Sequence, residues 1–195
     1  MSELSNVIGF DDAPFKHAHR GDVSLIGTIC SRTRLDVVLR SKVRRDGVNS
    51  TDAMLSLIQD TGRASHVQAV LLQGIAVAGF NVVDIHRLHE TLGLPVLVVA
   101  RRRPRMKAVL AALDGLPGGA KKRALVEAAG PMEELPPPRK GPRVSSVFVQ
   151  RAGLTRQAAV GLLRVTTLHG NIPEPLRLAH LIAGGVTTGV SRGRA

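Results

Sequence analysis

Acidic residues at two places in the chain could hold a divalent cation. Asp11 and Asp12 end a short β-prone run, and Asp46 lies in "RRDG" at the end of a later one. Clustered carboxylates hold Mg²⁺ through hard oxygen ligands, and the ion can activate water for phosphodiester hydrolysis. The alternative is structural, because an Asp-Asp pair at a strand end commonly serves a turn. From these residues alone both interpretations stay open.

A cationic run follows a later apolar segment. Directly after a predicted parallel strand, the run "ARRRPRMK" contains Arg101, Arg102, Arg103 and Arg105. Open α/β sheets have their ligand sites at that end of the strands, and guanidinium groups bind phosphates through paired hydrogen bonds. The run is therefore a candidate phosphate or nucleic-acid contact, with a solvated loop as the alternative.

The segment "QGIAVAGFN" could also approach a phosphate closely. Gly74 and Gly79 allow tight turns and a close backbone approach, and Asn81 ends the segment. The segment is no P-loop, because G-K-[ST] is missing, and it lacks the G-x-G-x-x-G pattern. Turn geometry alone is the alternative explanation for the glycines.

The composition favours a globular protein that binds polyanions. The chain has 195 residues, 44% of them hydrophobic, which suits one compact domain over 1–195 with a sizeable core. Lys and Arg number 27 against 15 Asp and Glu, a formal net charge of +12. Such an excess favours nucleic acid or nucleotides as partners. Aromatic residues make up only 2%, which leaves little for stacking on bases.

Cysteine content and apolar runs bear on the compartment. A single cysteine, Cys30, excludes an internal disulfide and suits a reducing cytosol. The N-terminal "MSELSNVIGF" lacks the pattern of a signal peptide. Gln73, Asn81 and glycines interrupt the long apolar run at 67–85, so we interpret it as a strand and a helix. We expect a cytoplasmic protein that makes no membrane contact.

The first half of the chain predicts a β-meander and then a helix. A short run ending at Asp12 and the runs Val23–Cys30 and Leu35–Val43 are β-prone, with a polar turn between the last two. The helix "NSTDAMLSLIQDT" follows, with Ser50 or Thr51 as its expected N-cap.

The rest predicts parallel strands and helices. "VQAVLLQG" and "LPVLVVAR" are buried strands joined by the helix "NVVDIHRLHETLG", which Gly93 closes and in which Asp84 is a surface or packing residue. Two helices and a Pro-rich surface loop near 131–143 come next. A last strand, "VSSVFVQRAG", a helix capped by Thr155 and a short Pro-initiated helix complete the chain. The order β-β-β-α-β-α-β followed by helices predicts an α/β, ribonuclease H-like fold: an antiparallel ribbon continued by parallel strands and flanked by helices.

Three segments resemble a known family. They are "IGFDDAPF", "LLQGIAVAGFNVVDIHRLHETLGLPVLVVARRRP" and "IPEPLRLAHLIAGG…SRGRA", in this order from Ile8 to Ala195. They resemble the endonuclease V-like family of unknown function, called in words the domain of unknown function ninety-nine, a distant relative of endonuclease V. The resemblance implies a ribonuclease H-like fold and magnesium-dependent cleavage of nucleic acid near inosine.

The resemblance also implies roles for individual residues. Asp11 matches the first metal ligand of endonuclease V, and Asp46 begins an Asp-Gly-x-Asp motif in which Asn49 replaces the second Asp. Gln73 stands where an Asp is expected, and a neutral amide is a poor Mg²⁺ ligand. The implied site therefore has Asp11 and Asp46 as catalytic residues, Asp11, Asp12 and Asp46 as ligands of Mg²⁺ or Mn²⁺, and Gln73 and Asn49 as lining residues of a depleted metal site.

Three function hypotheses follow. The first is an endonuclease V-like protein that binds DNA or RNA and, if active, hydrolyses a phosphodiester. The second is a catalytically inactive nucleic-acid-binding or interaction module of the same fold. The third is a nucleotide or small-molecule binding protein that uses "GFN" and the arginine run.

Overall fold

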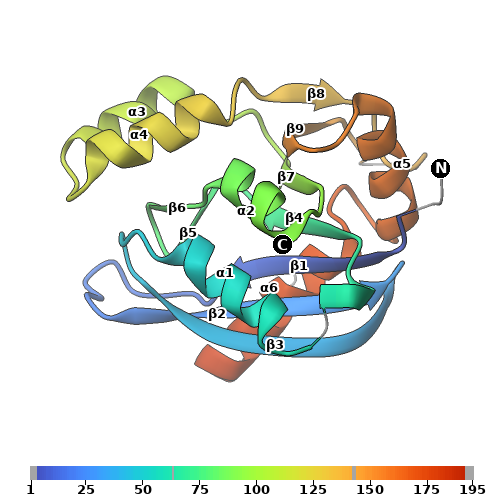
Figure 1. Ribbon diagram of the computed structural model, residues 1–195, viewed down its shortest axis with the longest axis horizontal. Coiled ribbons are helices and arrows are strands. Elements are labelled where there is room, and N and C mark those ends of the chain that lie inside the picture. Colours follow the sequence, from blue (N-terminus) through green and yellow to red (C-terminus); the bar gives the residue numbers. More distant parts are fainter. Residues whose placement is uncertain (1–3, 63, 142–143, 192–195) are drawn as a thin grey trace.

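The computed structural model describes residues 4–62, 64–141 and 144–191. Its centre is a seven-stranded mixed sheet with the order β3-β2-β1-β4-β7-β9-β8 (Figure 1). The strands are β1 (Asn6–Asp12), β2 (Asp22–Ser31), β3 (Arg34–Arg44), β4 (Ala69–Gln73), β7 (Val96–Ala100), β8 (Glu133–Leu135) and β9 (Val147–Ala152). A separate hairpin of β5 (Ala76–Val77) and β6 (Asn81–Val82) follows β4.

The pairing of the strands brings three chain segments to one edge of the sheet. β1, β2 and β3 form the expected antiparallel meander. β4 runs parallel to β1, and β7 runs parallel to β4, so these three strands end at the same edge. β9 pairs antiparallel with β7, and β8 antiparallel with β9. The edge where β1, β4 and β7 end is the one where ligand sites of α/β sheets are expected.

Helices cover both faces of this sheet. α1 (Ser50–Gln59) and α2 (Ile85–Leu92) pack on the face that carries Ile8 and Phe10. α5 (Arg156–Thr166) and the start of α6 (Glu174–Thr188) pack on the face of Val7 and Leu71. α3 (Met106–Asp114) and α4 (Gly119–Ala128) form a hairpin that projects beyond the sheet and shares a small apolar cluster with β6 (Figure 1). Ala64–His66 form a short 3₁₀ helix.

Several expectations for local structure are corrected. The N-cap of α1 is Asn49, not Ser50 or Thr51, because the Ser50 hydroxyl donates to Val82 O and the Thr51 hydroxyl accepts from Asp84 N–H. Asp84 is itself the N-cap of α2, since its carboxylate accepts from Arg87 N–H. Caps are chosen by tertiary partners as well as by residue type, which is why the sequence alone misassigned them.

Two further segments are more regular than expected. Glu133–Leu135, in the expected surface loop, add the edge strand β8. The expected short last helix is the longest helix of the described chain, with 15 residues. The Thr155 cap of α5 and the Gly93 end of α2 are confirmed. None of the helices in the described residues is long and apolar enough to cross a bilayer.

Candidate active site

An Asp–His pair lies at the edge where the parallel strands end. The Asp11 side chain, 10% exposed, comes from β1, and His180, 34% exposed, comes from the middle of α6. Nδ1 of His180 is 2.8 Å from Oδ2 of Asp11. The hydrogen bond that the imidazole donates to Asp11 raises the pKa of His180, and burial of the imidazole partly opposes this shift.

Asp11 meets α6 because side chains along β1 point alternately to the two faces of the sheet. Val7 belongs to the core under α5 and α6, whereas Ile8 and Phe10 belong to the core under α1 and α2. Successive side chains of a strand point to opposite faces, so Asp11 points toward α6. Gly9 lets the helix approach, because a Cβ at this position would lie 2.6 Å from the carbonyl carbon of Pro175.

Gln73 lies beside Asp11. The residues that precede them, Leu72 and Phe10, are partners across β4 and β1, and by alternation both side chains point to the α6 face. Oε1 of Gln73 is buried and has no hydrogen-bond partner. A buried amide oxygen without a partner is costly, so this atom is available to a ligand.

Asp12 ends β1 on the opposite face from Asp11, as the alternation of side chains along a strand requires. Burial, with the charge of Asp11 as the second cause, raises the pKa of Asp12 from 3.8 to about 7. A backbone hydrogen bond at Ala78 and the charge of His180 oppose the shift. Two adjacent carboxyl groups at one strand end therefore differ in their tendency to carry charge near neutral pH.

The arginine run borders this site. Arg101 is exposed at the end of β7, and its charge lowers the pKa of His180, which places the guanidinium within electrostatic reach of the imidazole. Arg103 lies over the Phe148 ring at 5.2 Å and 4.0 Å from a carboxylate oxygen of Glu134. Arg102 and Arg105 are exposed.

A hollow of about 480 Å³ adjoins His180. Pro14, Gly184, Thr188 and Val190 form the rest of its lining. The lining is mostly small or apolar, and among its described residues the imidazole is the one titratable group. The Asp–His pair is therefore reachable from an open depression between the end of α6 and the residues that follow β1.

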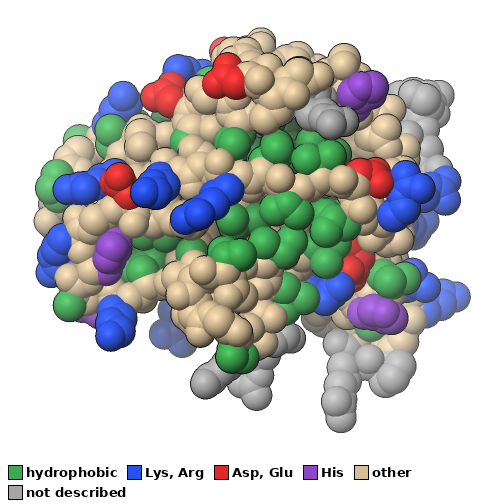
Figure 2. Space-filling model, turned by 90° about the horizontal axis from the view of Figure 1, so that it is seen from below, with side chains coloured by type: hydrophobic (Ala, Val, Ile, Leu, Met, Phe, Trp, Pro, Cys, Tyr) green, Lys and Arg blue, Asp and Glu red, His purple; other side chains and the backbone are tan. Residues whose placement is uncertain are grey.

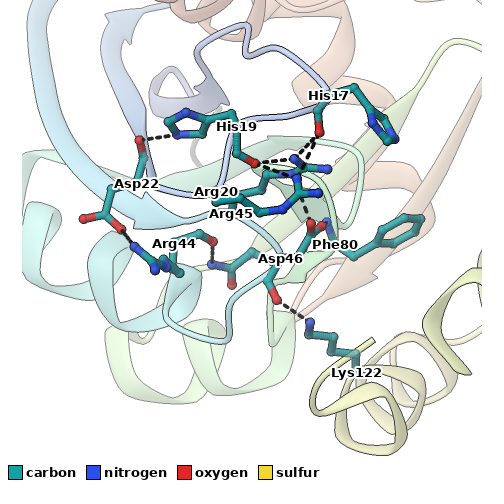
Figure 3. A network of polar contacts seen from close by, with 10 residues as sticks. His17, His19, Arg20, Asp22, Arg44, Arg45, Asp46, Phe80 and Lys122 are labelled. Atoms are coloured by element: carbon teal, nitrogen blue, oxygen red, sulfur yellow. Dashed lines mark hydrogen bonds and ion pairs between the residues drawn. The ribbon is translucent and has the colours of Figure 1, made fainter. Parts of the chain in front are cut away.

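Asp46 faces a different set of partners (Figure 3). It has a φ of +50°, its Oδ1 accepts from Phe80 N–H at 2.8 Å, and its Oδ2 is 3.1 Å from Nε of Arg45. Its backbone N–H donates to Ala78 O, and its carbonyl oxygen accepts from Nζ of Lys122 at 2.5 Å. Asp46 thus joins the β3–α1 connection to the β5–β6 hairpin and to α4.

Arg45 extends this network to the segment that follows Asp12 (Figure 3). Its guanidinium donates to the carbonyl oxygens of His17 and His19 and lies over the Phe15 ring at 5.4 Å. The backbone of the β1–β2 connection is therefore fixed through Arg45 to Asp46. His17 and His19 contribute to this network through their carbonyl oxygens and not through their imidazoles.

Lys122 is the buried end of the network. The residue is 1% exposed, and burial lowers the pKa of its amine while the charge of Asp46 opposes the shift. A cation buried to this extent is tolerated only with good partners, and the Asp46 carbonyl is one.

Asn81 and Asn49 are engaged inside the protein. Oδ1 of Asn81 accepts from Ser50 N–H, and its Nδ2 donates to Arg44 O and to Asn49 Oδ1. Oδ1 of Asn49 also accepts from Arg44 N–H. Every polar atom of the Asn81 side chain is thus used to hold β6 against the β3–α1 connection, and Asn81 is 0% exposed.

The two glycines of the β4–β6 segment differ in their surroundings. Gly74 and Gly79 both have positive φ, +82° and +84°. A Cβ at Gly74 would meet nothing within 4 Å, whereas one at Gly79 would lie 2.4 Å from Oδ1 of Asp46. Gly79 therefore allows the Asp46 carboxylate to reach Phe80 N–H.

The expected site residues lie in two adjoining groups. Asp11 and, by strand register, Gln73 lie on the side of His180, whereas Asp46, Asn49 and Asn81 hold the β3–α1 connection and the β5–β6 hairpin together. Asp12 lies between the two groups, because its carboxyl group has a backbone hydrogen bond with Ala78, whose carbonyl oxygen accepts from Asp46 N–H. Within residues 4–62, 64–141 and 144–191, no group of three or more His, Cys, Asp or Glu is arranged to hold an ion.

His180 is the residue that sequence reasoning missed. It follows Leu176 by four positions and precedes Ala183 by three, and both of these are 0% exposed. Helical spacing thus places His180 on the same side of α6 as the buried residues. The spacing of His180 from the apolar residues, within the segment "IPEPLRLAHLIAGG", was the sequence signal that could have identified it.

Basic side chains are spread over the face drawn in Figure 2. Lys and Arg lie at several separate places to the left and right of a central area of hydrophobic side chains. The positive charge of this face is therefore not gathered into a single patch.

Comparison with known proteins agrees with the sequence resemblance. Residues 3–187 match the model of a family described as endonuclease dU. A UPF0215 protein of Deinococcus radiodurans is 51% identical over 192 residues, which cover 98% of this chain and 93% of that protein. A UPF0215 protein of Thermococcus kodakarensis is 40% identical over 95% of this chain and 94% of its own length.

Solved structures share the fold. A protein of unknown function from Archaeoglobus fulgidus superposes with a TM-score of 0.82 at 29% identity, over 93% of this chain and 98% of that one. Human endonuclease V gives a TM-score of 0.59 at 18% identity, over 92% and 83%. Endonuclease V of Ciona intestinalis, in complex with DNA containing an inosine, gives 0.56 at 16%, over 90% and 82%. The expected ribonuclease H-like fold and the resemblance to an endonuclease V-like family are confirmed.

Proposed function

Because the chain belongs to the endonuclease dU family, we propose that it binds nucleic acid at the edge where β1, β4 and β7 end and cleaves a phosphodiester there. The observation that carries the proposal is the hydrogen bond between Asp11 and His180, beside the unpartnered oxygen of Gln73. Titratable groups with altered pKa values next to an open hollow are a common feature of catalytic sites.

Asp11 would hold a proton on Nδ1 of His180 by accepting a hydrogen bond from it. With Nδ1–H donated to Asp11, the other ring nitrogen, Nε2, is left to exchange a proton with water or with a leaving oxygen. Asp11 raises the pKa of the imidazole, so it favours the protonated form of His180, which can donate a proton from Nε2. Asp11 acts here as the orienting partner.

The donor atoms near Asp11 fit a hard divalent cation. Carboxylate oxygens and the buried Oε1 of Gln73 are oxygen ligands of the kind that Mg²⁺ or Mn²⁺ takes. Asp11 and Gln73 would hold the ion, with Asp12 nearby, and the ion would supply charge stabilisation to the phosphoryl oxygens. The neutral amide of Gln73 makes this set less negative than one with Asp there. We propose for Asp46 a role in supporting the site through the contacts of Arg45.

The basic edge would hold the nucleic acid. Arg101 lies within electrostatic reach of His180, and Arg102 and Arg105 are exposed close to it in the chain. Guanidinium groups suit phosphates, and the affinity of such contacts falls with salt. The family description and the inosine-containing complex of Ciona endonuclease V suggest DNA with deoxyuridine or inosine as substrates for comparison.

A cleavage assay tests the proposal. End-labelled oligonucleotides with one deoxyuridine, one inosine or neither, single- and double-stranded, are incubated in Mg²⁺, Mn²⁺ or EDTA. We expect cleavage that needs the cation, is lost in Asp11→Asn and His180→Asn, and rises in Gln73→Asp. Asp60→Asn and His169→Asn, at exposed positions, are the matched controls.

The second candidate function is an inactive nucleic-acid-binding module, and the neutral Gln73 favours it. In that case the natural chain binds oligonucleotides without cutting them in any cation, and only Gln73→Asp cleaves. If neither form cuts or binds nucleic acid, both candidates are excluded. The remaining hypothesis, a nucleotide or small-molecule binding protein, would then require a ligand that does not contact the fully engaged side chain of Asn81.

A further inference from the structure

A cationic hollow lies away from the Asp11–His180 pair. It has a volume of about 560 Å³ and lies between the β8–β9 connection and α5. Three of its lining residues are cationic, Arg139, Lys140 and Arg164, and the others are Pro137, Pro138, Gly141 and Val144. Among the described residues, no acidic side chain contributes to this lining.

The charges of this hollow are not neutralised within the described part of the chain. Neither Lys140 nor Arg164 has an ion pair there, and Arg139 donates only to the carbonyl oxygen of Thr167, at 3.2 Å. Most other arginines with close partners in this structure face carboxylates, as Arg151 and Arg177 do. Three like charges around one depression repel one another, and an anion placed between them would remove that cost.

The wall behind Arg139 holds a second unsatisfied group. Thr167 is 1% exposed, and its hydroxyl has no hydrogen-bond partner. Its main chain is fixed at both ends, because Thr167 N–H donates to Leu163 O and its carbonyl accepts from Arg139. A buried hydroxyl without a partner is rare in folded proteins. Thr167 is not among the residues that line the hollow, so its hydroxyl lies behind the wall and does not contact a ligand there.

The surrounding backbone gives the hollow a fixed shape. Pro138 is buried, and Ser145, next to Val144, donates its N–H to Oδ1 of Asn171 at 2.9 Å. The Asn171 amide in turn donates to the Ser145 hydroxyl. The β8–β9 connection is thereby attached to the segment that leads into α6.

We propose that this hollow, with Arg139, Lys140 and Arg164, is a binding site for a phosphate group. Guanidinium and ammonium groups that converge on one depression suit a phosphate oxyanion, for which they supply both charge and donors. The phosphate belongs either to a nucleic-acid backbone or to a small phosphorylated molecule, and in both cases the contacting chemistry is the same.

The position of the hollow suits a contact with the backbone of a nucleic acid, remote from the phosphodiester that is cleaved. This contact rests on the proposed function. β4 and β7 separate β1 from β9, so three strand spacings, roughly 14 Å, lie between the strand of Asp11 and that of Val147. A nucleic-acid strand rises about 3.4 Å per nucleotide, so one that reaches both places spans at least about four nucleotides.

The first arm of the test measures oligonucleotide binding by fluorescence anisotropy, in the Asp11→Asn background to prevent cleavage. Lys140→Ala and Arg164→Ala are compared with Lys42→Ala, which removes the same charge from an exposed position on β3 at the other edge of the sheet. We expect Lys140→Ala and Arg164→Ala to weaken the binding of a 20-nucleotide strand more than Lys42→Ala does. A dinucleotide is too short to reach both places, so its binding should differ little between the hollow variants and Lys42→Ala. Between 50 and 200 mM salt, each lost phosphate contact should reduce the fall in affinity roughly threefold.

The second arm uses inorganic phosphate and thermal unfolding. Phosphate that binds only the folded state stabilises it by RT ln(1 + [phosphate]/Kd) and so raises Tm as its concentration rises. This rise should be lost in Lys140→Ala and Arg164→Ala but kept in Lys42→Ala. An effect in this arm alone supports the hollow as a site for a small phosphorylated molecule and leaves the cleavage proposal untouched. If both hollow variants equal Lys42→Ala in both arms, the phosphate site is overturned, whatever the cleavage assay shows.

Discussion

Nδ1 of His180 lies 2.8 Å from Oδ2 of Asp11, although 169 positions separate the two residues in the chain. One comes from the first strand and the other from the last helix, so the pair exists only when the sheet and α6 are assembled. A change that displaces α6 from the sheet should therefore also break the Asp11–His180 contact.

Replacing His180 should change how stability depends on pH. The folded pKa of His180 is raised above its ordinary value, so protonation favours the folded state. This contribution is complete below about pH 6.5 and is lost as pH rises through the folded pKa. We expect His180→Ala to lower Tm clearly at pH 5.5 and by much less at pH 9, in EDTA.

His169, which is exposed, provides the control for this measurement. His169→Ala should lower Tm little and equally at both pH values. A deficit in His180→Ala that stays constant between pH 5.5 and pH 9 would mean that the imidazole contributes through packing and not through its charge.

Asp12 should make the protein less stable as pH rises toward neutrality. Its folded pKa of about 7 lies above the ordinary 3.8, so folding favours the protonated form, and that advantage is lost between these two values. In EDTA, Asp12→Asn should remove most of this decline and unfold in urea with roughly 1–3 kcal/mol more stability than the natural chain at pH 8. A decline that persists unchanged in Asp12→Asn, as we expect for Asp60→Asn, would assign it to other groups.

Gly74 and Gly79 form a matched pair for testing the Asp46 network. Alanine at either position must adopt a positive φ, which costs about 1–2 kcal/mol. Only at Gly79 does the new Cβ also meet the Asp46 carboxylate, so Gly79→Ala should cost at least about 1 kcal/mol more than Gly74→Ala. Urea unfolding measures the difference.

A double-mutant cycle separates the steric contribution. In the Asp46→Ala background the extra cost of Gly79→Ala should shrink, because the clashing carboxylate is gone. Equal costs of the two alanine substitutions in the natural background would show that the Asp46 carboxylate moves aside without loss.

Asn81 should behave as a structural residue. Asn81→Asp replaces two donor hydrogens with a carboxylate oxygen facing Arg44 O and Asn49 Oδ1, so we expect a loss of about 3 kcal/mol or more. Asn171→Asp, at a partly exposed amide, should cost less than about 1 kcal/mol. If Asn81→Asp instead left stability unchanged and weakened nucleic-acid binding, Asn81 would be a ligand contact.

The sheet of this protein was largely readable from its sequence. The β-prone runs before Asp12 and at Val23–Cys30 and Leu35–Val43 correspond to β1, β2 and β3, and the two uninterrupted apolar runs correspond to β4 and β7. The signals for β4 and β7 are strong because strands buried on both faces leave no polar alternation. By contrast β8 has three residues, and its pairing with β9 depends on tertiary contacts that no local pattern encodes.

The candidate site was only partly readable. Asp11 was singled out because it ends a β-prone run, which local patterns can locate, whereas Gln73 was singled out because the resemblance to the endonuclease V-like family implies an Asp there. The contact of His180 with Asp11 depends on how α6 packs across the sheet, which is a long-range property. The partners of Asp46 likewise come from Phe80 and Lys122, residues distant in the chain.

Gly9 determines how closely α6 packs on β1. Because the backbone of Pro175 occupies the volume that a side chain at position 9 would fill, any larger residue there would lift α6 off β1. His180 would then be carried out of reach of Asp11, two positions further along the same strand. The absence of a side chain at position 9 thus sets the distance between β1 and α6, and the contact of the imidazole with Asp11 depends on that distance.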